Sequence, residues 1–333
     1  MKRLRANDPC WCASGEKLKR CHGDRSALQR PPVRRGVPAA LRSVPESIAR
    51  PPYLATGGHP TGPSGRQVFD AAGLEAMRHA GRVAAQVLLD AGAEVRPGVT
   101  TAELNDIAHD SYVRQGAYPS TLGYRGFAHA SCISVNEVAC HGIPDSRPLA
   151  DGDIVNIDIT AFVDGYHGDT SATFAVGTIN PAADALVAAT CEATLAGIAA
   201  AQPGRTINEI GRAVEAVARP RGYGVVTMYG GHGIGTVFHA APHIHHTAHP
   251  SATAKLVPGM TFTVEPMLTA GREDLVSWDD GWTEVTIDGL ISAQFEHTVA
   301  VTADGVEILT VTDDGTSAVT WPNAVVTAAG AGR

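Results

Sequence analysis

The sequence predicts an α+β fold made of two similar halves that are related by a pseudo-twofold axis. The first observation is a helix start that follows Pro97-Gly98 and recurs after Pro203-Gly204, an offset of 106 residues. The second is a strand-like segment at residues 152–158 that recurs at residues 259–265, an offset of 107 residues. Similar segments at a nearly constant offset indicate a duplicated unit. Matched residues of the two halves are therefore predicted to meet at the axis.

The N-terminal segment is basic, whereas the rest of the chain is acidic. Residues 1–35 carry ten Lys and Arg against three Asp and Glu, a net charge of +7. The whole chain carries −8, so the remaining residues carry −15. A basic arm on an acidic body predicts a polyanionic partner for the arm, and a solubilising tail is the alternative.

Four soft metal ligands lie close together near the N-terminus. They are Cys10, Cys12, Cys21 and His22. Thiolate and imidazole suit tetrahedral zinc, and so short a segment has too little apolar surface to fold without a metal. The stretch resembles the SEC-C zinc motif, with departures at Trp11, Ala13 and Leu18 that involve no ligand. We therefore predict a structural zinc in a motif over residues 1–30, with four unrelated groups in a disordered tail as the alternative.

Residues 31–66 hold eight of the 21 prolines, which predicts a linker that is part extended and part flexible.

No apolar run follows the basic N-terminus, and no later apolar stretch approaches the ~20 residues needed to span a bilayer. We therefore expect a cytoplasmic protein without membrane contact. Its six cysteines are expected to be thiols and not disulfides.

Helical periodicity begins after Asp70, a suitable N-cap, and apolar residues recur three and four apart up to Gly92. A second helix is predicted to start with a capping box at residues 100–103 and to end near Gly116. The same device recurs at residues 206–209 and is predicted to open a later helix.

A polar strand face carries the first two candidate carboxylates. Residues 154–161 alternate between polar and apolar side chains, and Asp158 lies on the polar face. Asp164-Gly165 is a hairpin signal, and a two-residue loop there would place Asp158 opposite Ser171. Asp169 lies two positions away on the same face, so the two carboxylates are predicted to converge.

The second half of the chain supplies two more carboxylates and an imidazole. Glu265 ends a strand-like run, and Glu296 lies on a strand-like segment at residues 293–301. His232 lies among glycines that let the backbone approach a site closely. Each residue alone has an ordinary explanation as a cap, a surface acid or a turn residue. Together with the first pair they suit two divalent cations, because carboxylates bridge cations and are costly to bury unpaired.

These residues stand in segments that resemble the type I methionine aminopeptidases, without a long break from about Phe69 to Thr310. The most specific segments are residues 118–124 (YPSTLGY), 134–137 (SVNE), 140–144 (CHGIP), 153–158 (DIVNID), 167–170 (HGDT), 231–235 (GHGIG), 259–267 (GMTFTVEPM) and 294–298 (QFEHT). The resemblance implies a catalytic domain over residues 67–315 and leaves residues 316–333 as a C-terminal tail.

The resemblance implies the pita-bread fold, a curved and mainly antiparallel sheet with helices on the outside, which agrees with the duplication. It also implies two divalent cations, which are cobalt, manganese, iron or zinc, bridged by Asp169 and Glu296. The implied metal ligands are Asp158, Asp169, His232, Glu265 and Glu296. Substrate contacts are assigned to His141 and His239. The implied lining of the methionine pocket is Thr121, Tyr124, Phe127, Cys132, Phe238 and Trp282. Thr121 stands at a position that is cysteine in many relatives.

The implied reaction is hydrolysis of the bond after an N-terminal methionine, with a preference for a small second residue. The cations would lower the pKa of a bridging water, and Glu265 would move its proton. His239 would stabilise the developing oxyanion, and His141 would hold the scissile amide nitrogen or the next residue. Nascent polypeptide N-termini are the expected partner of a monomeric enzyme. The basic arm and zinc motif suit docking to the ribosome.

Two alternative functions remain open. An X-Pro aminopeptidase or prolidase uses a similar ligand set, although the segments at residues 140–142 and 265–267 favour the methionine enzyme. A catalytically dead binding module of the same fold is the second alternative, and the presence of all five ligands argues against it.

The chain departs from the family pattern at a group of histidines where relatives have fewer. For this group a polar loop is favoured over an adventitious metal site. These histidines are His243, His245, His246 and His249.

Overall fold

A pair of helices followed by a run of strands occurs twice along the chain in the computed structural model, which describes residues 7, 17, 19, 32–60 and 65–320. The helices are α1 (Ala71–Gly92), α2 (Thr101–Arg114), α3 (Pro181–Ala200) and α4 (Asn208–Ala218), with short 3-10 helices η3 (Pro52–Thr56) and η4 (Tyr124–Gly126). The strands are β1 (Tyr118–Pro119), β2 (Cys132–Val135), β3 (Val138–Cys140), β4 (Ile154–Val163), β5 (Tyr166–Ala175), β6 (Gly224–Val225), β7 (Gly231–Gly233), β8 (Ala240–Ile244), β9 (Thr261–Val264), β10 (Met267–Thr269), β11 (Leu275–Ser277), β12 (Glu284–Thr286), β13 (Ser292–Gln294), β14 (Glu296–Val301) and β15 (Val306–Ile308).

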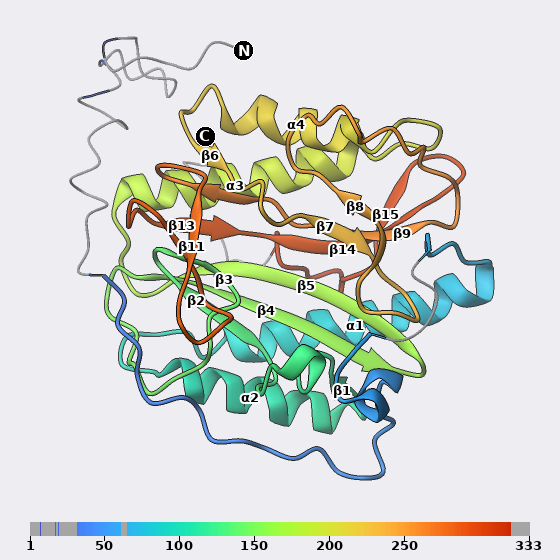
Figure 1. The fold of residues 1–333 in the computed structure, drawn as a ribbon, viewed down its shortest axis with the longest axis horizontal. Helices are drawn as coiled ribbons and strands as arrows, with labels where there is room; N and C mark the ends of the chain where they lie inside the picture. Colours follow the sequence, from blue (N-terminus) through green and yellow to red (C-terminus); the bar gives the residue numbers. More distant parts are fainter. Residues whose placement is uncertain (1–6, 8–16, 18, 20–31, 61–64, 321–333) are drawn as a thin grey trace.

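A curved sheet forms the centre of the molecule (Figure 1). Its strand order is β1-β4-β5-β14-β9-β7-β8, with β2 beside β4 and β15 beside β14. The pairings in this sheet are antiparallel. Two small three-stranded sheets, β13-β10-β6 and β11-β12-β3, complete the β structure of the described residues. The predicted mainly antiparallel sheet with helices outside it is confirmed.

The sheet consists of two halves that join between β5 and β14, a contact that we call the seam. The middle of the strand order is β4-β5-β14-β9, and β9 begins 107 residues after β4. Helix α1 packs against β4 and β5, whereas α3 packs against β9, β10 and β13. Figure 1 shows the pair α1 and α2 on one side of the seam and the pair α3 and α4 on the other. The predicted arrangement of two similar halves is therefore present.

The helix starts agree with the sequence in the first half and differ in the second. The Asp70 side chain accepts a hydrogen bond from the amide of Gly73, and Thr100 and Glu103 form a complete capping box. Helix α4 has Ile207 as its N-cap, without a side-chain hydrogen bond. The predicted capping box at residues 206–209 is therefore wrong, although the helix it was expected to open is present.

Helix α3 corrects one expectation about membrane segments. It is 20 residues long, with a mean hydropathy of 1.4 over its most apolar window, so by length and composition it resembles a membrane span. Of that window, 56% is buried inside the structure. Leu186, Ala193 and other apolar residues of α3 belong to the largest core cluster, which explains the composition of the helix by packing.

A segment that we call the strap, residues 32–60, lies along the body of the protein, which consists of residues 65–320. Pro38 forms an isolated bridge with Asp145, and the Ala39 amide donates a hydrogen bond to the Pro144 carbonyl. Further along, Val44 and Ile48 pack in a buried cluster with Tyr118 and Phe162, and Tyr53 packs in another with Tyr124 and Phe238. The expectation of a partly flexible linker therefore does not describe residues 32–60, because their buried side chains and backbone hydrogen bonds hold them against the body.

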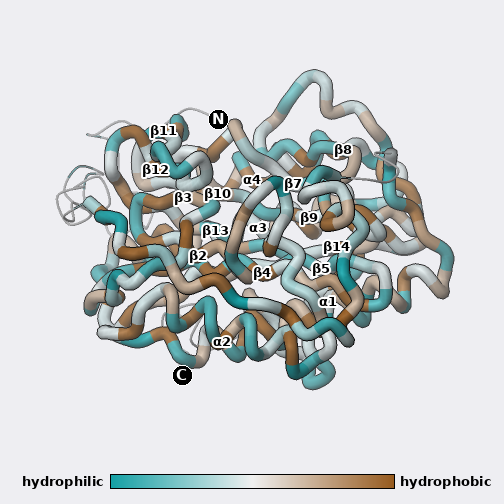
Figure 2. Tube along the Cα trace, turned by 60° about the horizontal axis from the view of Figure 1, so that its bottom comes forward, coloured by the Kyte–Doolittle hydropathy of each residue, from teal (hydrophilic) through white to brown (hydrophobic). Residues whose placement is uncertain are grey.

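The core lies between the helices and the central sheet. Figure 2 shows hydrophobic segments along the inner strands and helices and more hydrophilic segments along outer loops. The largest cluster joins α1, α2, β4 and α3, and Ala318 also belongs to it. The beginning of the predicted C-terminal tail thus packs on the body, and the structure describes that segment as far as Thr320.

Candidate metal centre and substrate pocket

A pocket of about 390 Å³ lies at the seam, and all thirteen active-site residues predicted from the sequence line it. They are Thr121, Tyr124, Phe127, Cys132, His141, Asp158, Asp169, His232, Phe238, His239, Glu265, Trp282 and Glu296. They come from both halves of the fold and from the loops before β2, after β3 and after β7. Their roles remain predictions, but the fold brings them to one cavity.

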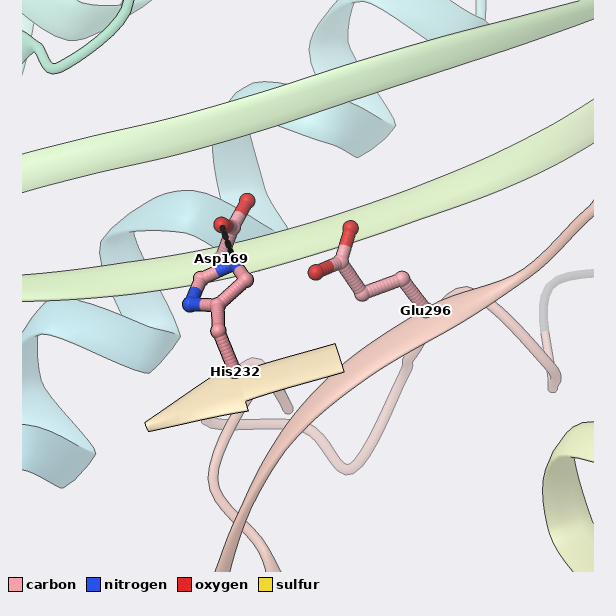
Figure 3. A group of neighbouring side chains, drawn as sticks. All are labelled: Asp169, His232 and Glu296. Carbon is pink, nitrogen blue, oxygen red and sulfur yellow. Dashed lines mark ion pairs between the residues drawn. The ribbon is translucent and has the colours of Figure 1, made fainter. Parts of the chain in front are cut away.

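Asp169, His232 and Glu296 form the tightest group, with one potential ligand atom from each within 4.8 Å of the others (Figure 3). The His232 Nε2 atom lies 3.7 Å from Asp169 Oδ2 and 3.6 Å from Glu265 Oε1. These residues come from β5, β7, β14 and the end of β9, so strands from both sides of the seam supply the group.

The β4–β5 hairpin sets the positions of Asp158 and Asp169. Asp164 and Gly165 form its two-residue loop with φ of 50° and 87°, and Asp158 pairs with Ser171 as predicted. Asp169 pairs with Thr160, and the Thr160 hydroxyl donates a hydrogen bond of 2.7 Å to Asp169 Oδ1. Cross-strand partners share a face, so both carboxylates lie on the pocket side of the sheet.

Burial gives the acidic residues pKa values far above their usual range. It raises the pKa of Asp158 to about 7 and that of Glu265 to about 8, although a hydrogen bond from Thr263 opposes the second shift. Burial, followed by the charges of the neighbouring carboxylates, holds the pKa of Asp169 and Glu296 well above their usual values. Arg125 is the one Lys or Arg among the described residues that line the pocket. A cluster of this kind fits divalent cations, which would replace the protons and compensate the negative charge.

Glycines on both sides of His232 let β7 lie close to its neighbours. A Cβ atom on Gly231 would stand 2.2 Å from the Thr263 carbonyl oxygen, and one on Gly233 would stand 2.2 Å from that of Ala241. The His232 amide donates to the Thr263 hydroxyl at 3.0 Å, which fixes the strand. Burial lowers the pKa of His232 to about 4, so its imidazole is neutral and has a lone pair for a cation.

Aromatic side chains form the apolar part of the pocket. The rings of Tyr124 and Phe238 are 4.8 Å apart, and those of Phe127 and Trp282 are 5.2 Å apart. His239 stacks on Tyr124 at 5.1 Å, and burial holds its pKa well below the usual value. Thr121 is 7% exposed and donates to the His129 carbonyl at 2.9 Å. An apolar side chain fits this lining, and the neutral imidazole next to it can hold or donate a proton.

Sequence reasoning did not assign the other residues that line the pocket. They are Arg125, Cys140, Thr160, Tyr229, Gly230, Met267, Gly281, Glu284 and Gln294. The alternation of β4 places Thr160 on the same face as Asp158, so the pattern contains a signal for that residue. Gln294 donates to Glu265 Oε2 at 3.3 Å from the end of β13. The strand-like segment at residues 293–301 divides at Phe295 between two sheets, which local alternation does not reveal.

The histidine-rich segment is not a simple polar loop. His243 lies on β8 opposite His232, and its ring is 4.5 Å from that of His245, which stacks at 4.2 Å on His249. His246 is buried, and its Nε2 accepts a hydrogen bond of 3.1 Å from the Glu265 amide. One of the four histidines therefore supports the backbone of a predicted ligand.

The predicted zinc ligands Cys10, Cys12, Cys21 and His22 lie outside the described residues. Residues 7–24 nevertheless match the family model of the SEC-C motif. This match agrees with the resemblance noted from the sequence, and the bound zinc itself stays a prediction.

The known proteins that this chain resembles are metallopeptidases, which agrees with a pocket suited to metal ions. Residues 75–303 match the family model described as metallopeptidase family M24. The chain is 51% identical to methionine aminopeptidase 2 of Mycobacterium tuberculosis, over 83% of this chain and 96% of that protein. The structure matches that of methionine aminopeptidase from Rickettsia prowazekii with a TM-score of 0.72 and 43% identity, over 74% of this chain and 100% of the other. A prolidase from Pyrococcus furiosus matches with a TM-score of 0.61 and 23% identity, over 74% of this chain and 66% of the other, which shows a shared fold.

Proposed function

Because this chain belongs to the metallopeptidase family M24, we propose that it is a methionine aminopeptidase that removes the initiator methionine from nascent polypeptides. The observation that carries the proposal is one cavity that joins a buried carboxylate and imidazole cluster to an aromatic, apolar wall. The cluster suits a metal-dependent hydrolase, and the wall suits the thioether side chain of methionine.

The five predicted ligands would hold two divalent cations, for which cobalt, manganese, iron and zinc are the candidates. Their fit rests on four carboxylates whose pKa values are raised, of which Asp169 and Glu296 are buried and the others are partly buried, and on one neutral imidazole beside them. When bound, the cations would supply water of lowered pKa and would polarise the carbonyl of the bond that is cut.

The residues of the chain would then position the peptide and move protons. Glu265 would take the proton of the attacking water and pass it to the leaving amine, and Gln294 and Thr263 hold its two carboxylate oxygens at 3.3 and 2.7 Å. His239 would stabilise the developing oxyanion, and His141 would hold the scissile amide nitrogen or the next residue. Burial lowers the pKa of His141, while the Glu284 charge acts in the opposite direction.

The pocket also suggests the specificity. The wall made by Tyr124, Phe127, Phe238 and Trp282 is the place for the methionine side chain. The residue after methionine would face the remaining lining, which includes Tyr229, Met267 and Gln294. We therefore propose a preference for Ala, Ser or Gly at the second position.

Metal-stripped protein should be incubated with the peptides Met-Ala-Ser and Ala-Pro-Ala, each with and without cobalt or manganese. Release of methionine that depends on added metal is the expected result. Release from the proline peptide would favour an X-Pro aminopeptidase, and the absence of release from both peptides would favour a binding module.

We also propose that the N-terminal motif docks the enzyme to the ribosome in the cytoplasm, where nascent N-termini emerge. The net charge of +7 over residues 1–35 supports this proposal, because Lys and Arg suit a phosphate backbone. Deletion of residues 1–30 should weaken co-sedimentation with ribosomes at low salt, and unchanged co-sedimentation would contradict the proposed docking.

We also propose that the enzyme is a monomer, and sedimentation velocity would test this oligomeric state.

A further inference from the structure

A carboxylate apart from the five predicted ligands lies in the wall of the same pocket. Glu284 is 5% exposed and lies on β12, in the small β11-β12-β3 sheet. Its Oε1 accepts hydrogen bonds from the Tyr229 hydroxyl at 2.9 Å and from the Ser277 hydroxyl at 2.7 Å. Its Oε2 is buried and has no hydrogen-bond partner among the described residues. One oxygen thus has two donors, and the other has none.

This arrangement is unfavourable for folding. A buried carboxylate oxygen without a donor costs free energy, because it loses its water and gains no replacement. Apolar residues of similar volume often replace buried charged groups without loss of stability. Stability therefore explains Glu284 poorly, and its role is better sought in the groups that its bonded oxygen holds.

One of those groups, Tyr229, contacts a residue with a proposed role in the reaction. The Tyr229 ring meets the His141 ring edge-on, with centroids 4.9 Å apart and an interplanar angle of 88°. Tyr229 lies between β6 and β7 and is only partly buried, so its hydrogen bond to Glu284 limits rotation of the ring.

Glu284 is also linked to the backbone beside His141. It pairs with Cys140, the last residue of β3, and His141 follows with a φ of 55°. A left-handed backbone at a non-glycine residue persists where its surroundings hold it. Strand pairing thus holds the chain before His141, and the phenol held by Glu284 packs against its ring.

We propose that Glu284 is a positioning residue, which accepts the Tyr229 hydroxyl and thereby keeps the His141 imidazole directed at the peptide bond that is cut. The proposal rests on the proposed function, in which His141 contacts the substrate. Removal of the hydrogen bond would let the phenol turn and the imidazole shift. Misplacement of a substrate contact by about 1 Å lowers the rate about a hundredfold.

Three variants separate the effect of the hydrogen bond between Glu284 and Tyr229 from the effect of the Glu284 charge. Glu284→Leu removes the acceptor, Glu284→Gln keeps an acceptor of nearly the same shape, and Tyr229→Phe removes the donor but keeps the ring. With Met-Ala-Ser and saturating manganese, the Leu and Phe variants should lower kcat about tenfold to a hundredfold, with KM within about threefold. The Gln variant should keep kcat within about threefold. The double variant Glu284→Leu with Tyr229→Phe should be no slower than the slower single variant, because both remove the same bond.

Ser277→Ala is the matched control, because it removes the other donor to the same oxygen and leaves the Tyr229 bond in place. It should keep the kcat of the wild type. Metal content should be unchanged in every variant, and the unfolding midpoint of Glu284→Leu should equal or exceed that of the wild type. If Glu284→Leu does not fold, Tyr229→Phe with the Gln and Ala controls completes the test.

Wild-type kcat in Tyr229→Phe would overturn the inference, and so would equal losses in the Gln and Leu variants, which would assign the effect to charge. A wild-type enzyme that releases no methionine would overturn the proposed function instead. Active wild type with unaffected variants would overturn only the role of Glu284.

Discussion

Asp169 has little freedom in the pocket, because one carboxylate oxygen accepts the Thr160 hydroxyl at 2.7 Å and the other lies 3.7 Å from His232. Asp169→Ala removes a predicted bridging ligand from the centre of the group. We expect loss of bound metal and a fall in kcat/KM of at least about a thousandfold, since bound cations contribute several kcal/mol to such reactions. Metal analysis of the purified variant and methionine release from Met-Ala-Ser would measure both effects.

The matched control for that change is Asp313→Ala. The Asp313 side chain is 96% exposed, and its one ion pair within the described part of the chain is with Arg82 at 3.5 Å, so the variant should keep full activity and metal content. Normal turnover in Asp169→Ala would contradict the assignment of the site.

The raised pKa values predict how cation binding depends on pH. Without cations, the pKa of Asp158 is about 7 and that of Glu265 about 8, whereas both carboxyls ionise near pH 4 in an unfolded chain. The folded form therefore holds these protons more tightly, and their contribution to stability is lost as pH rises through about 7 to 8. Cations replace the protons, so the stabilisation that they give should grow between pH 6.5 and 8.5.

Unfolding midpoints with a chelator and with manganese, taken across that interval, would test this expectation. The interval excludes the lower pH at which histidines with a lowered folded pKa, such as the partly buried His232, act in the opposite direction. Glu265→Gln should flatten the dependence. A manganese effect that shrinks as pH rises would refute the pKa explanation.

At the residue scale, local patterns could predict the convergence of Asp158 and Asp169 because a two-residue hairpin loop fixes their register. Tyr229 and Glu284 carried no comparable signal. They are 55 positions apart and meet only because the small β11-β12-β3 sheet folds beside the loop before β7. Alternation within one strand contains no information about such a contact.

At the element scale, helices α2 and α4 differ in their capping, although a Thr stands at the start of both segments in the sequence. The Thr100 side chain accepts a hydrogen bond from the Glu103 amide, whereas Thr206 precedes an N-cap that has no side-chain hydrogen bond. Thr100→Ala should therefore lower the free energy of unfolding by about 1 kcal/mol. Thr206→Ala, the matched change, should have an effect within about 0.5 kcal/mol. Urea unfolding of both variants would measure the difference, and equal losses would show that Thr206 caps after all.

Two features of the fold, helix α3 and the change of sheet within residues 293–301, could not be predicted from the sequence pattern. Helix α3 is apolar on its exposed side as well as on its buried side, so it lacks the polar stripe that reveals an amphipathic helix. Residues 293–301 read as one extended segment, yet the chain changes sheets at Phe295, which is fully buried. A change of sheet leaves the strand pattern intact, so only the three-dimensional fold reveals it.

At the scale of the whole molecule, the strap packs against the lining of the candidate pocket. Tyr53 is 4% exposed, donates to the Ser120 carbonyl, and meets the Tyr124 ring at 5.0 Å. Tyr53→Ala should lower the free energy of unfolding by about 3 kcal/mol, as for other buried aromatic residues. It should also raise KM for Met-Ala-Ser about threefold to tenfold, because Tyr124 loses its packing partner. Urea unfolding and steady-state kinetics would test the two effects.

Leu41→Ala is the control for the strap, because Leu41 is 76% exposed and its truncation should change neither quantity. Unchanged KM in Tyr53→Ala would show that Tyr124 keeps its place without the strap. The strap could not be predicted from proline content, because its partners, such as Asp145 and Tyr118, lie more than 60 residues further along the chain.

The seam divides the predicted ligand set between two stretches of chain. Asp158 and Asp169 precede the connection from β5 to α3, whereas His232, Glu265 and Glu296 follow it. A polypeptide cut in that connection would leave neither fragment with a complete set of ligands. Release of methionine would then require both fragments to bind each other across β5 and β14, so the enzyme divided there would act as a sensor of fragment complementation.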